Sequence, residues 1–337
     1  MLDSLKFIKG SVARKDFVPA LTHFSIRNGV IRGSNGLICM AAPIGLDIDC
    51  QPKAQPFTKA VEICEDMDST PAFSMTAAGR LTIKSGKFKV HIECSPEPYP
   101  DIQPEGESVE VQPGLLAAFK TLAPMIAEDA SRPWARGILL RGGSAFATNN
   151  VVIGQYWVGS DFGFDVNIPD ECIKEILRVK MDPISIQATP RSITFHFPEG
   201  RWIKSQLLTT DWPNVAPVLD RPCSPAPVPS DFFSDLARLA PYADAARRVF
   251  IRGSTLCTHV EEGSGASSVV EWNEGSAESK TAPELRGVYN IDLLRSLDGL
   301  VARMDLSLYP QPALFFGPDT DAGYPVLRGA VVGMKGV

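Results

Sequence analysis

The residue types that most often carry out catalysis are present in this chain, but they do not stand in the patterns that catalysis uses. The four histidines, His23, His91, His196 and His259, are isolated, and three of them fall in segments that favour strands. The pairs Asp47 with Asp49 and Asp319 with Asp321 have no further acidic neighbours that would complete a metal site. The motifs G-x-S-x-G, G-x-x-x-x-G-K-[ST], G-x-G-x-x-G and H-E-x-x-H are absent. We therefore expect no enzyme, no cofactor and no metal, with the acidic pairs on an exposed strand face and in a hairpin turn.

Cysteine and tryptophan are the other side chains with chemical potential. The seven cysteines, at positions 39, 50, 64, 94, 172, 223 and 257, are odd in number and form no C-x-x-C pair. This pattern argues against a disulfide framework and a closed zinc site, so we expect reduced and mostly buried thiols. Tryptophan can stack on single-stranded bases. Because the five tryptophans (134, 157, 202, 212 and 272) are scattered, packing in a core or an interface is the preferred interpretation.

Composition places the chain among folded soluble proteins. Its 337 residues predict two or three domains, and 44% apolar with 21% charged residues is typical of globular chains. We find neither an apolar run long enough to span a membrane nor a secretory signal, so we expect a cytoplasmic protein. The net charge of −6 disfavours uniform coating of nucleic acid or of an acidic membrane, but it leaves a local basic surface open.

The chain repeats itself three times. Arg27, Arg141 and Arg252 each end a short strand before a glycine turn, at spacings of 114 (141 − 27) and 111 (252 − 141). The hairpin patterns at 80–92 and 191–207 lead into YPDI (99–102) and WPNV (212–215), and LAP recurs at 122–124 and 239–241. Several landmarks in the same order predict three tandem repeats.

Proline-rich stretches at 96–108 and 219–230 mark the predicted boundaries, which give domains at 1–108, 109–224 and 225–337. Each domain is predicted to hold two helices and about eight short strands, which makes the fold class α+β. Pro124 and Pro241 should end or kink their helices. The predicted helix pairs are 4–12 and 56–67, 113–129 and 169–180, and 229–248 and 290–303.

These landmarks resemble one family, the bacterial sliding clamp or β subunit of the replicative DNA polymerase. The resemblance rests on LTIKSGKFKVHI (81–92) with PYPDI (98–102), ATNN (147–150), NIPDECIKEILR (167–178), DWPNVAPVL (211–219) and AVVGMK (330–335). It covers almost the whole chain, and the divergence is large, as in phage-encoded clamps. It implies three clamp domains, each with two helices on antiparallel sheets. It further implies a head-to-tail homodimer, in which each chain forms half of a six-domain ring around double-stranded DNA, tethers a polymerase and catalyses nothing.

The resemblance also implies which residues face DNA, because helices line the ring in this family. A sliding protein needs loose charge attraction to phosphates, since bonds to base edges would fix its register. Each candidate can equally be read as part of a solvated helix face. Lys15 matches a family DNA-contact position and is the strongest candidate. The candidates are Lys6, Lys9, Arg14, Lys15, Lys59, Lys120, Lys174, Arg178, Arg238 and Arg295.

A second implied site lies between the second and third domains, where polymerase and clamp loader dock a short hydrophobic linear peptide. Apolar walls suit leucine or aromatic side chains, and methionine adapts to different ligands. The same residues can also be ordinary strand positions and a frayed tail. The implied pocket comprises Ala135, Thr148, Asn150, Val151, Val152, Ile153, Pro213, Pro217, Val218, Val332 and Met334.

Three departures from the family pattern leave alternatives open. The first repeat begins at its helix, whereas the second has a preceding strand at 107–112. Asp170 and Glu171 stand where the family commonly carries basic residues, which either weakens the expected DNA contact or shifts it to Lys174 and Arg178. Val151 and Val152 replace a common His-Arg pair, so a different peptide is expected. The alternatives are a clamp-derived binding or scaffold module that forms no ring and, more remotely, a DNA enzyme that uses the aspartate pairs.

Overall fold

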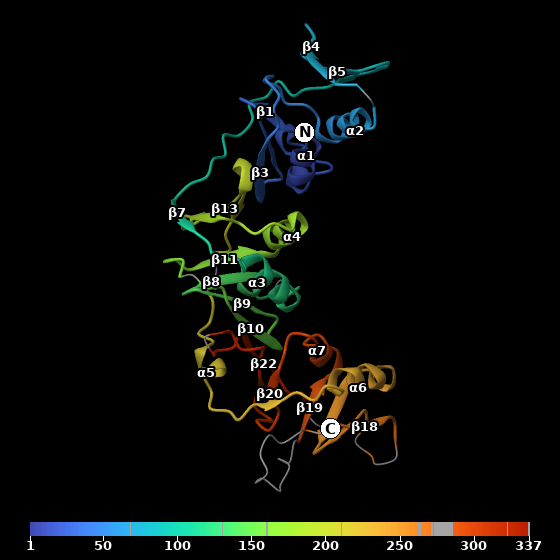
Figure 1. Cartoon of the computed structure of the whole chain (residues 1–337), viewed down its shortest axis with the longest axis vertical. Coiled ribbons are helices and arrows are strands. Elements are labelled where there is room, and N and C mark those ends of the chain that lie inside the picture. Colours follow the sequence, from blue (N-terminus) through green and yellow to red (C-terminus); the bar gives the residue numbers. More distant parts are fainter. Residues whose placement is uncertain are drawn as a thin grey trace. The chain divides into compact units, whose positions relative to one another are not determined.

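The computed structural model (Figure 1) describes residues 1–67, 69–129, 131–159, 161–209, 211–259, 261, 264–270, 272, 286–321 and 323–335. The chain divides into two compact units, 1–119 with 162–209 and 120–161 with 210–337. Each unit is built around one large antiparallel sheet. Within the described residues, no helix is long and apolar enough to cross a membrane.

The first unit contains a seven-stranded sheet that combines strands of the first and second repeats. A separate three-stranded sheet holds β4 (Ala72–Met75), β5 (Leu81–Ser85) and β6 (Phe88–Ile92), which includes the predicted hairpin at 80–92. The helices α1 (Leu2–Ile8), α2 (Ala54–Glu65) and α4 (Asp170–Val179), the last directly after β11 (Val166–Pro169), lie on one side of the strands (Figure 1). The order in the large sheet is β1 (Ser25–Arg27), β2 (Val30–Ser34), β3 (Ile38–Pro43), β14 (Arg201–Gln206), β13 (Ser192–Phe197), β12 (Ser185–Ala188) and β7 (Glu107–Glu110).

The second unit repeats this arrangement with strands of the second and third repeats. A four-stranded sheet contains β18 (Ser267–Val269), β17 (Thr255–Cys257), β16 (Arg248–Arg252) and β19 (Arg286–Asn290). The helices are α5 (Ala216–Leu219), α6 (Phe232–Leu239) and α7 (Ile291–Arg295), with α5 on the opposite side of the strands from the other two (Figure 1). The strands that this unit contributes to the large sheet run β8 (Gly137–Arg141), β9 (Ser144–Thr148), β10 (Val152–Trp157), β22 (Leu327–Val331), β21 (Ala313–Phe316), β20 (Arg303–Asp305) and β15 (Ala226–Pro227).

The two large sheets correspond strand for strand. In the first, β3 pairs with β14, and Ala41 stands opposite Trp202. In the second, β10 pairs with β22, and Gln155 stands opposite Arg328. Because the first three strands of both sheets keep the 114-residue spacing found in the sequence, each position on one sheet has a counterpart on the other.

The helices confirm the predicted pairs, but all except α2 are shorter than predicted, and α2 keeps the predicted length with a shift of two residues. The predicted helix at 113–129 is α3 (Leu115–Leu122), which ends at a 3₁₀ turn containing Pro124, and α6 ends in the same way before Pro241. Proline lacks the backbone N–H that an α-helix interior needs, which explains both ends. The prediction of 290–303 was wrong in length. The helix α7 stops at Arg295, and Gly299 adopts a positive φ of 71° that a helix does not allow.

Arg178 joins α4 to α1 within the first unit. Its guanidinium donates hydrogen bonds to the backbone oxygens of Lys6 (2.7 Å) and Phe7 (2.5 Å), which lie at the end of α1. It also pairs with Glu175 at 2.7 Å. The last carbonyls of a helix have no partner within the helix, so a cation there satisfies them and complements the helix dipole.

We predict that Arg178→Ala destabilises the protein by about 1–2 kcal/mol, because hydrogen bonds to a charged group are lost at a partly exposed site. Urea unfolding at neutral pH measures the change. Lys174→Ala is the matched control. It removes a cation of the same helix and its exposed pair with Asp170, and should cost only about 0.3–0.5 kcal/mol. Equal losses in the two variants would contradict the role of Arg178.

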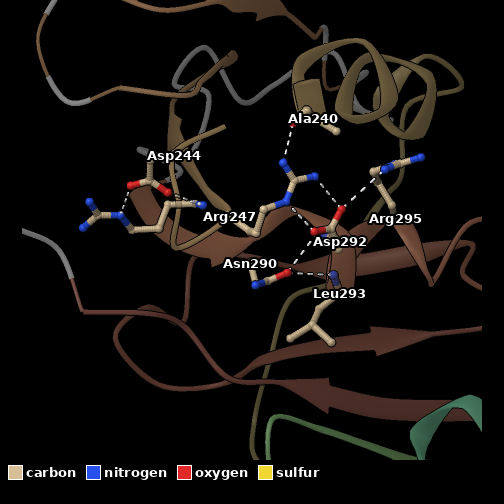
Figure 2. A network of polar contacts seen from close by, with 8 residues as sticks. Ala240, Asp244, Arg247, Asn290, Asp292, Leu293 and Arg295 are labelled. Carbon is tan, nitrogen blue, oxygen red and sulfur yellow. Dashed lines mark hydrogen bonds and ion pairs between the residues drawn. The ribbon is translucent and has the colours of Figure 1, made fainter. Parts of the chain in front are cut away.

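A network of polar contacts ties the end of α6 to the start of α7 (Figure 2). Arg247 donates to both carboxylate oxygens of Asp292, at 2.6 and 2.8 Å, and to the backbone oxygen of Ala240. The side chain of Asn290 caps α7 by accepting from the backbone N–H groups of Asp292 and Leu293. Arg295 contacts the same carboxylate at 3.4 Å. The hydrogen bond from Arg247 and the nearby positive charges hold the pKa of Asp292 below its usual range.

A lowered pKa makes this contribution to stability depend on pH. The contribution is present above the unfolded-state pKa of Asp, about 3.9, and is lost as the pH falls through the lower folded-state pKa. We expect Asp292→Asn to be less stable than the wild type at pH 7 by up to about 1 kcal/mol, since the pair is half exposed.

That difference should shrink as the pH falls below about 4, because Asp292 then takes up a proton first in the unfolded state and, at lower pH, also in the folded state. Urea midpoints measured across this range test it. Asp298→Asn, at an exposed position just beyond α7, should show no such trend. A stability difference that does not change with pH would argue against the ion pair.

Candidate partner-binding site

The predicted pocket residues map to one face of the second large sheet. This face carries Phe146, Ile153 and Ala330, and we call it the second outer face. Leu139, Phe146, Leu314 and Ala330 form its buried floor together with Trp212 and Leu219. The segment that follows Trp212, including α5, packs over this floor through the partly buried Val215 and Val218. For Trp212, the interpretation of the tryptophans as packing residues is therefore confirmed.

The ATNN motif builds the turn that leads into β10. The Thr148 hydroxyl donates to the backbone oxygen of Val152 (2.7 Å) and accepts from the backbone N–H of Asn150 (3.0 Å). The side chain of Asn149 accepts from the N–H groups of Val151 and Val152. Asn150 has a positive φ of 71°, which asparagine tolerates better than most residues. The turn thereby holds Val151 in an exposed position, with 38% of its surface accessible.

The segment after β22 continues this surface. The N–H of Val332 donates to the backbone oxygen of Val151 at 2.8 Å, and Val332 is 39% exposed. Met334 is held by its backbone, since its N–H donates to Val288 and its oxygen accepts from the Tyr309 hydroxyl (2.9 Å). The tail expected to fray is therefore fixed as far as Met334. Two exposed valines lie side by side at the edge of the apolar floor.

The predicted pocket residues divide by burial. Ala135, Thr148 and Val152 are buried, so they support the surface from beneath. Val151, Ile153, Val218, Val332 and Met334 are exposed or partly exposed apolar side chains, and Asn150, Pro213 and Pro217 are exposed. The structure thus brings the set together in one unit, and its role in binding stays a prediction.

Sequence reasoning missed one contact between two aromatic side chains. Trp134 packs edge-on against Trp212 with ring centroids 5.3 Å apart. The Trp212 indole nitrogen is buried and has no hydrogen-bond partner among the described residues. Burial also raises the pKa of the neighbouring Cys223 thiol, which keeps it neutral. The sequence indicates only that the tryptophans are packing residues. No local pattern predicts a contact between two residues that are 78 positions apart (212 − 134).

The equivalent face of the first large sheet carries Cys39, Ala41 and Trp202 and is here called the first outer face. The counterpart of Ala330 is Lys204, which stands opposite Cys39 as Ala330 stands opposite Ile153. The Lys204 side chain is only 11% exposed, and it bonds to the backbone oxygen of Gln103 and the carboxylate of Glu105. Together with Ile102, this segment fills the position that the second outer face leaves apolar.

All ten predicted DNA-facing cations are exposed. Arg178 is engaged with α1, and Lys174, Arg238 and Arg295 pair with carboxylates of their own helices. The side chains of the other candidates form no hydrogen bond or ion pair with any described residue, so their charges are available to an anionic partner. They are Lys6, Lys9, Arg14, Lys15, Lys59 and Lys120.

The aspartate pairs and the cysteines are the remaining groups that the sequence singled out. Asp319 lies in the hairpin between β21 and β22, as predicted, and pairs with Arg303. Asp49 pairs with Arg27 at 3.8 Å, but it lies outside the regular strands, contrary to the strand face predicted for it. Within the described part of the chain, no three His, Cys, Asp or Glu residues gather as metal ligands. All seven cysteines are free thiols, and three of them are fully buried.

No protein-family model matches the chain, and no curated protein matches its sequence. Solved structures do match. The β subunit of the DNA polymerase of Streptococcus pyogenes is 16% identical, with a TM-score of 0.82 over 99% of this chain and 97% of that one. The sliding clamp of Pseudomonas aeruginosa bound to griselimycin is 17% identical, with a TM-score of 0.78 over 99% and 97%.

The sliding clamp of Bacillus subtilis is 15% identical, with a TM-score of 0.80 over 100% of this chain and 97% of that one. The similarity extends along the full length of the chain. It reflects the helices and antiparallel sheets that recur from repeat to repeat, as the sequence predicted. The chain therefore has the three-domain fold of the bacterial DNA polymerase sliding clamps.

Proposed function

We propose that this protein is a DNA sliding clamp, a processivity factor without catalytic activity. Two chains would close head to tail into a ring around duplex DNA, with the exposed, unpaired cations of the helices toward the phosphates. The observation that carries the proposal is the similarity in fold to sliding clamps along the whole chain. In this role the protein acts in the cytoplasm, and its free thiols suit that compartment.

We propose further that a replicative polymerase, a clamp loader and other partners dock a short linear peptide on the second outer face. Support comes from the difference between the two corresponding faces. The first is filled by Lys204 and the segment around Ile102, whereas the second exposes Val151 and Val332 beside an apolar floor. The P. aeruginosa clamp was solved with griselimycin bound, so a clamp of this fold does take a ligand.

The predicted DNA contacts suit sliding. Lys6 and Lys9 lie on or next to α1, and Arg14 and Lys15 lie in the loop that follows. Cations on long side chains attract phosphates without reading base edges, so they hold the duplex without fixing a register. We keep the predicted domain boundaries, 1–108, 109–224 and 225–337, as part of the proposal.

The competing proposal is a clamp-derived module that forms no ring. Native mass separates the two, because a ring requires about twice the chain mass of 36.5 kDa. We expect the dimer mass, and after loading a longer lifetime on nicked circular duplex than on a short linear duplex. Binding to linear duplex should weaken steeply with salt. A monomer, or equal lifetimes on both DNA forms, would argue for the module.

Lys15→Ala provides a finer test of the DNA surface. Loss of one phosphate contact should lower the slope of log affinity against log salt by about 1. Lys87→Ala, an exposed lysine in the turn between β5 and β6, is the control and should leave the slope unchanged. Equal slopes for all three proteins would remove Lys15 from the DNA contact.

For the peptide surface, we predict that Val151→Asp weakens peptide binding at least tenfold. A buried valine contributes about 1.5–3 kcal/mol, and each factor of ten needs about 1.4 kcal/mol. The probe is a labelled linear peptide selected on the wild-type protein from a randomised library, and binding is followed by fluorescence anisotropy. Met334→Asp should weaken binding similarly and leave the dimer intact.

The matched control is Leu37→Asp. Leu37 is the counterpart of Val151 on the first outer face, and its backbone oxygen accepts from Gln206 as that of Val151 accepts from Val332. It is also an exposed apolar residue, so the substitution carries the same chemical change. If Leu37→Asp weakened the peptide as much as Val151→Asp did, the peptide would not bind the second outer face selectively.

A further inference from the structure

A cavity of about 490 Å³ lies on the second outer face, beyond the predicted peptide pocket. It opens between Trp157 at the end of β10 and Tyr324 in the hairpin before β22, and Phe316 lines it from β21. The Trp157 and Tyr324 rings meet at right angles with centroids 6.0 Å apart. They are 37% and 43% exposed, so two large aromatic side chains border a hollow at the surface.

A line of hydrogen-bonded polar groups separates this cavity from the apolar floor. The amide of Gln155 donates to Ser144 (3.0 Å) and accepts from Arg328 (2.7 Å), and Arg328 pairs with Asp220 at 2.8 Å. Gln155 and Arg328 thus line one side of the cavity and are held in place by these partners. The second outer face therefore has two apolar sectors with a polar line between them.

The cavity offers unused hydrogen-bond donors. Neither the Trp157 indole N–H nor the Tyr324 hydroxyl bonds to a described residue. Exposed aromatic rings with a free donor at one edge suit a ligand that brings an apolar side chain and a carbonyl oxygen together, as a peptide does. The first outer face lacks this combination, because the counterparts of Gln155 and Trp157 there are Ala41 and Pro43.

We propose that this cavity is a second anchor point for the same linear peptide that binds the second outer face, and that it takes an aromatic or large aliphatic side chain. This inference rests on the proposed function. The spacing supports one continuous ligand, because Ile153 and Trp157 project from the same face of β10, four residues apart. A strand rises about 3.3 Å per residue, so the two sectors lie about 13 Å apart. An extended peptide covers that distance in about four residues, and its carbonyl oxygens pass over the polar line.

The test uses labelled linear peptides selected on the wild-type dimer from a randomised library. We expect the bound sequences to carry two apolar anchors about four residues apart. Trp157→Ala should weaken such a peptide about tenfold, and replacing the second anchor of the peptide by alanine should do the same. Both changes remove the same contact between the peptide and the cavity. Combining them should therefore weaken binding little more than either change alone. Tyr324→Ala repeats the measurement in case Trp157→Ala does not fold.

The outcomes separate the two proposals. If Val151→Asp abolishes binding while Trp157→Ala and Tyr324→Ala leave it unchanged, the second anchor is wrong and the proposed peptide surface stands. If the losses of binding free energy from Trp157→Ala and from the alanine replacement in the peptide simply add, the second anchor of the peptide does not contact the cavity. If the variants instead change the dimer mass in sedimentation, the cavity is a contact between two copies of the chain. If selection yields no peptide, or Val151→Asp has no effect, the proposed peptide surface and this inference both fail.

Discussion

The fold depends on strand edges that one repeat cannot satisfy by itself. The strand β3 would end a sheet with a row of unpaired N–H and C=O groups if β14, from the next repeat, did not pair with it. The same requirement joins β10 to β22. These two ladders produce the large sheets around which the two compact units form. They also explain why the compact units do not coincide with the sequence repeats.

The two large sheets have equivalent backbones, but the side chains on their outer faces differ. Their backbone arrangements match, down to the hydrogen bond from Gln206 to Leu37 and its counterpart from Val332 to Val151. The side chains do not match. Lys204 extends over the first face and bonds to Gln103 and Glu105, whereas Ala330 at the equivalent position is a small apolar residue that packs into a buried apolar floor. A difference of a few side chains therefore separates the face over which Lys204 extends from the face that we propose as the peptide-binding surface.

The same contrast holds among the cations. Arg178 and Arg247 bond to backbone oxygens at helix ends, so these charges hold helices together. The side chains of Lys6 and Lys9, on α1 and directly after it, form no hydrogen bond or ion pair with a described residue. A chain of net charge −6 can thus present positive charge locally, because many of its acidic groups lie elsewhere or neutralise a structural arginine.

Local sequence patterns determined the repeat number, the two helices of each repeat and the hairpins at 80–92 and 191–207, since proline, glycine and residue alternation act over a few neighbouring positions. They also identified the landmarks ATNN, WPN and AVVGMK. The length of the last helix was missed, because Gly299 and the packing that follows outweighed the helical pattern at 290–303. The tertiary structure alone decided that Trp134 meets Trp212, that Lys204 fills one outer face and that Trp157 and Tyr324 border a cavity on the other. Each of these depends on which strands pair across repeats, and no local pattern encodes a contact between side chains so far apart in the sequence.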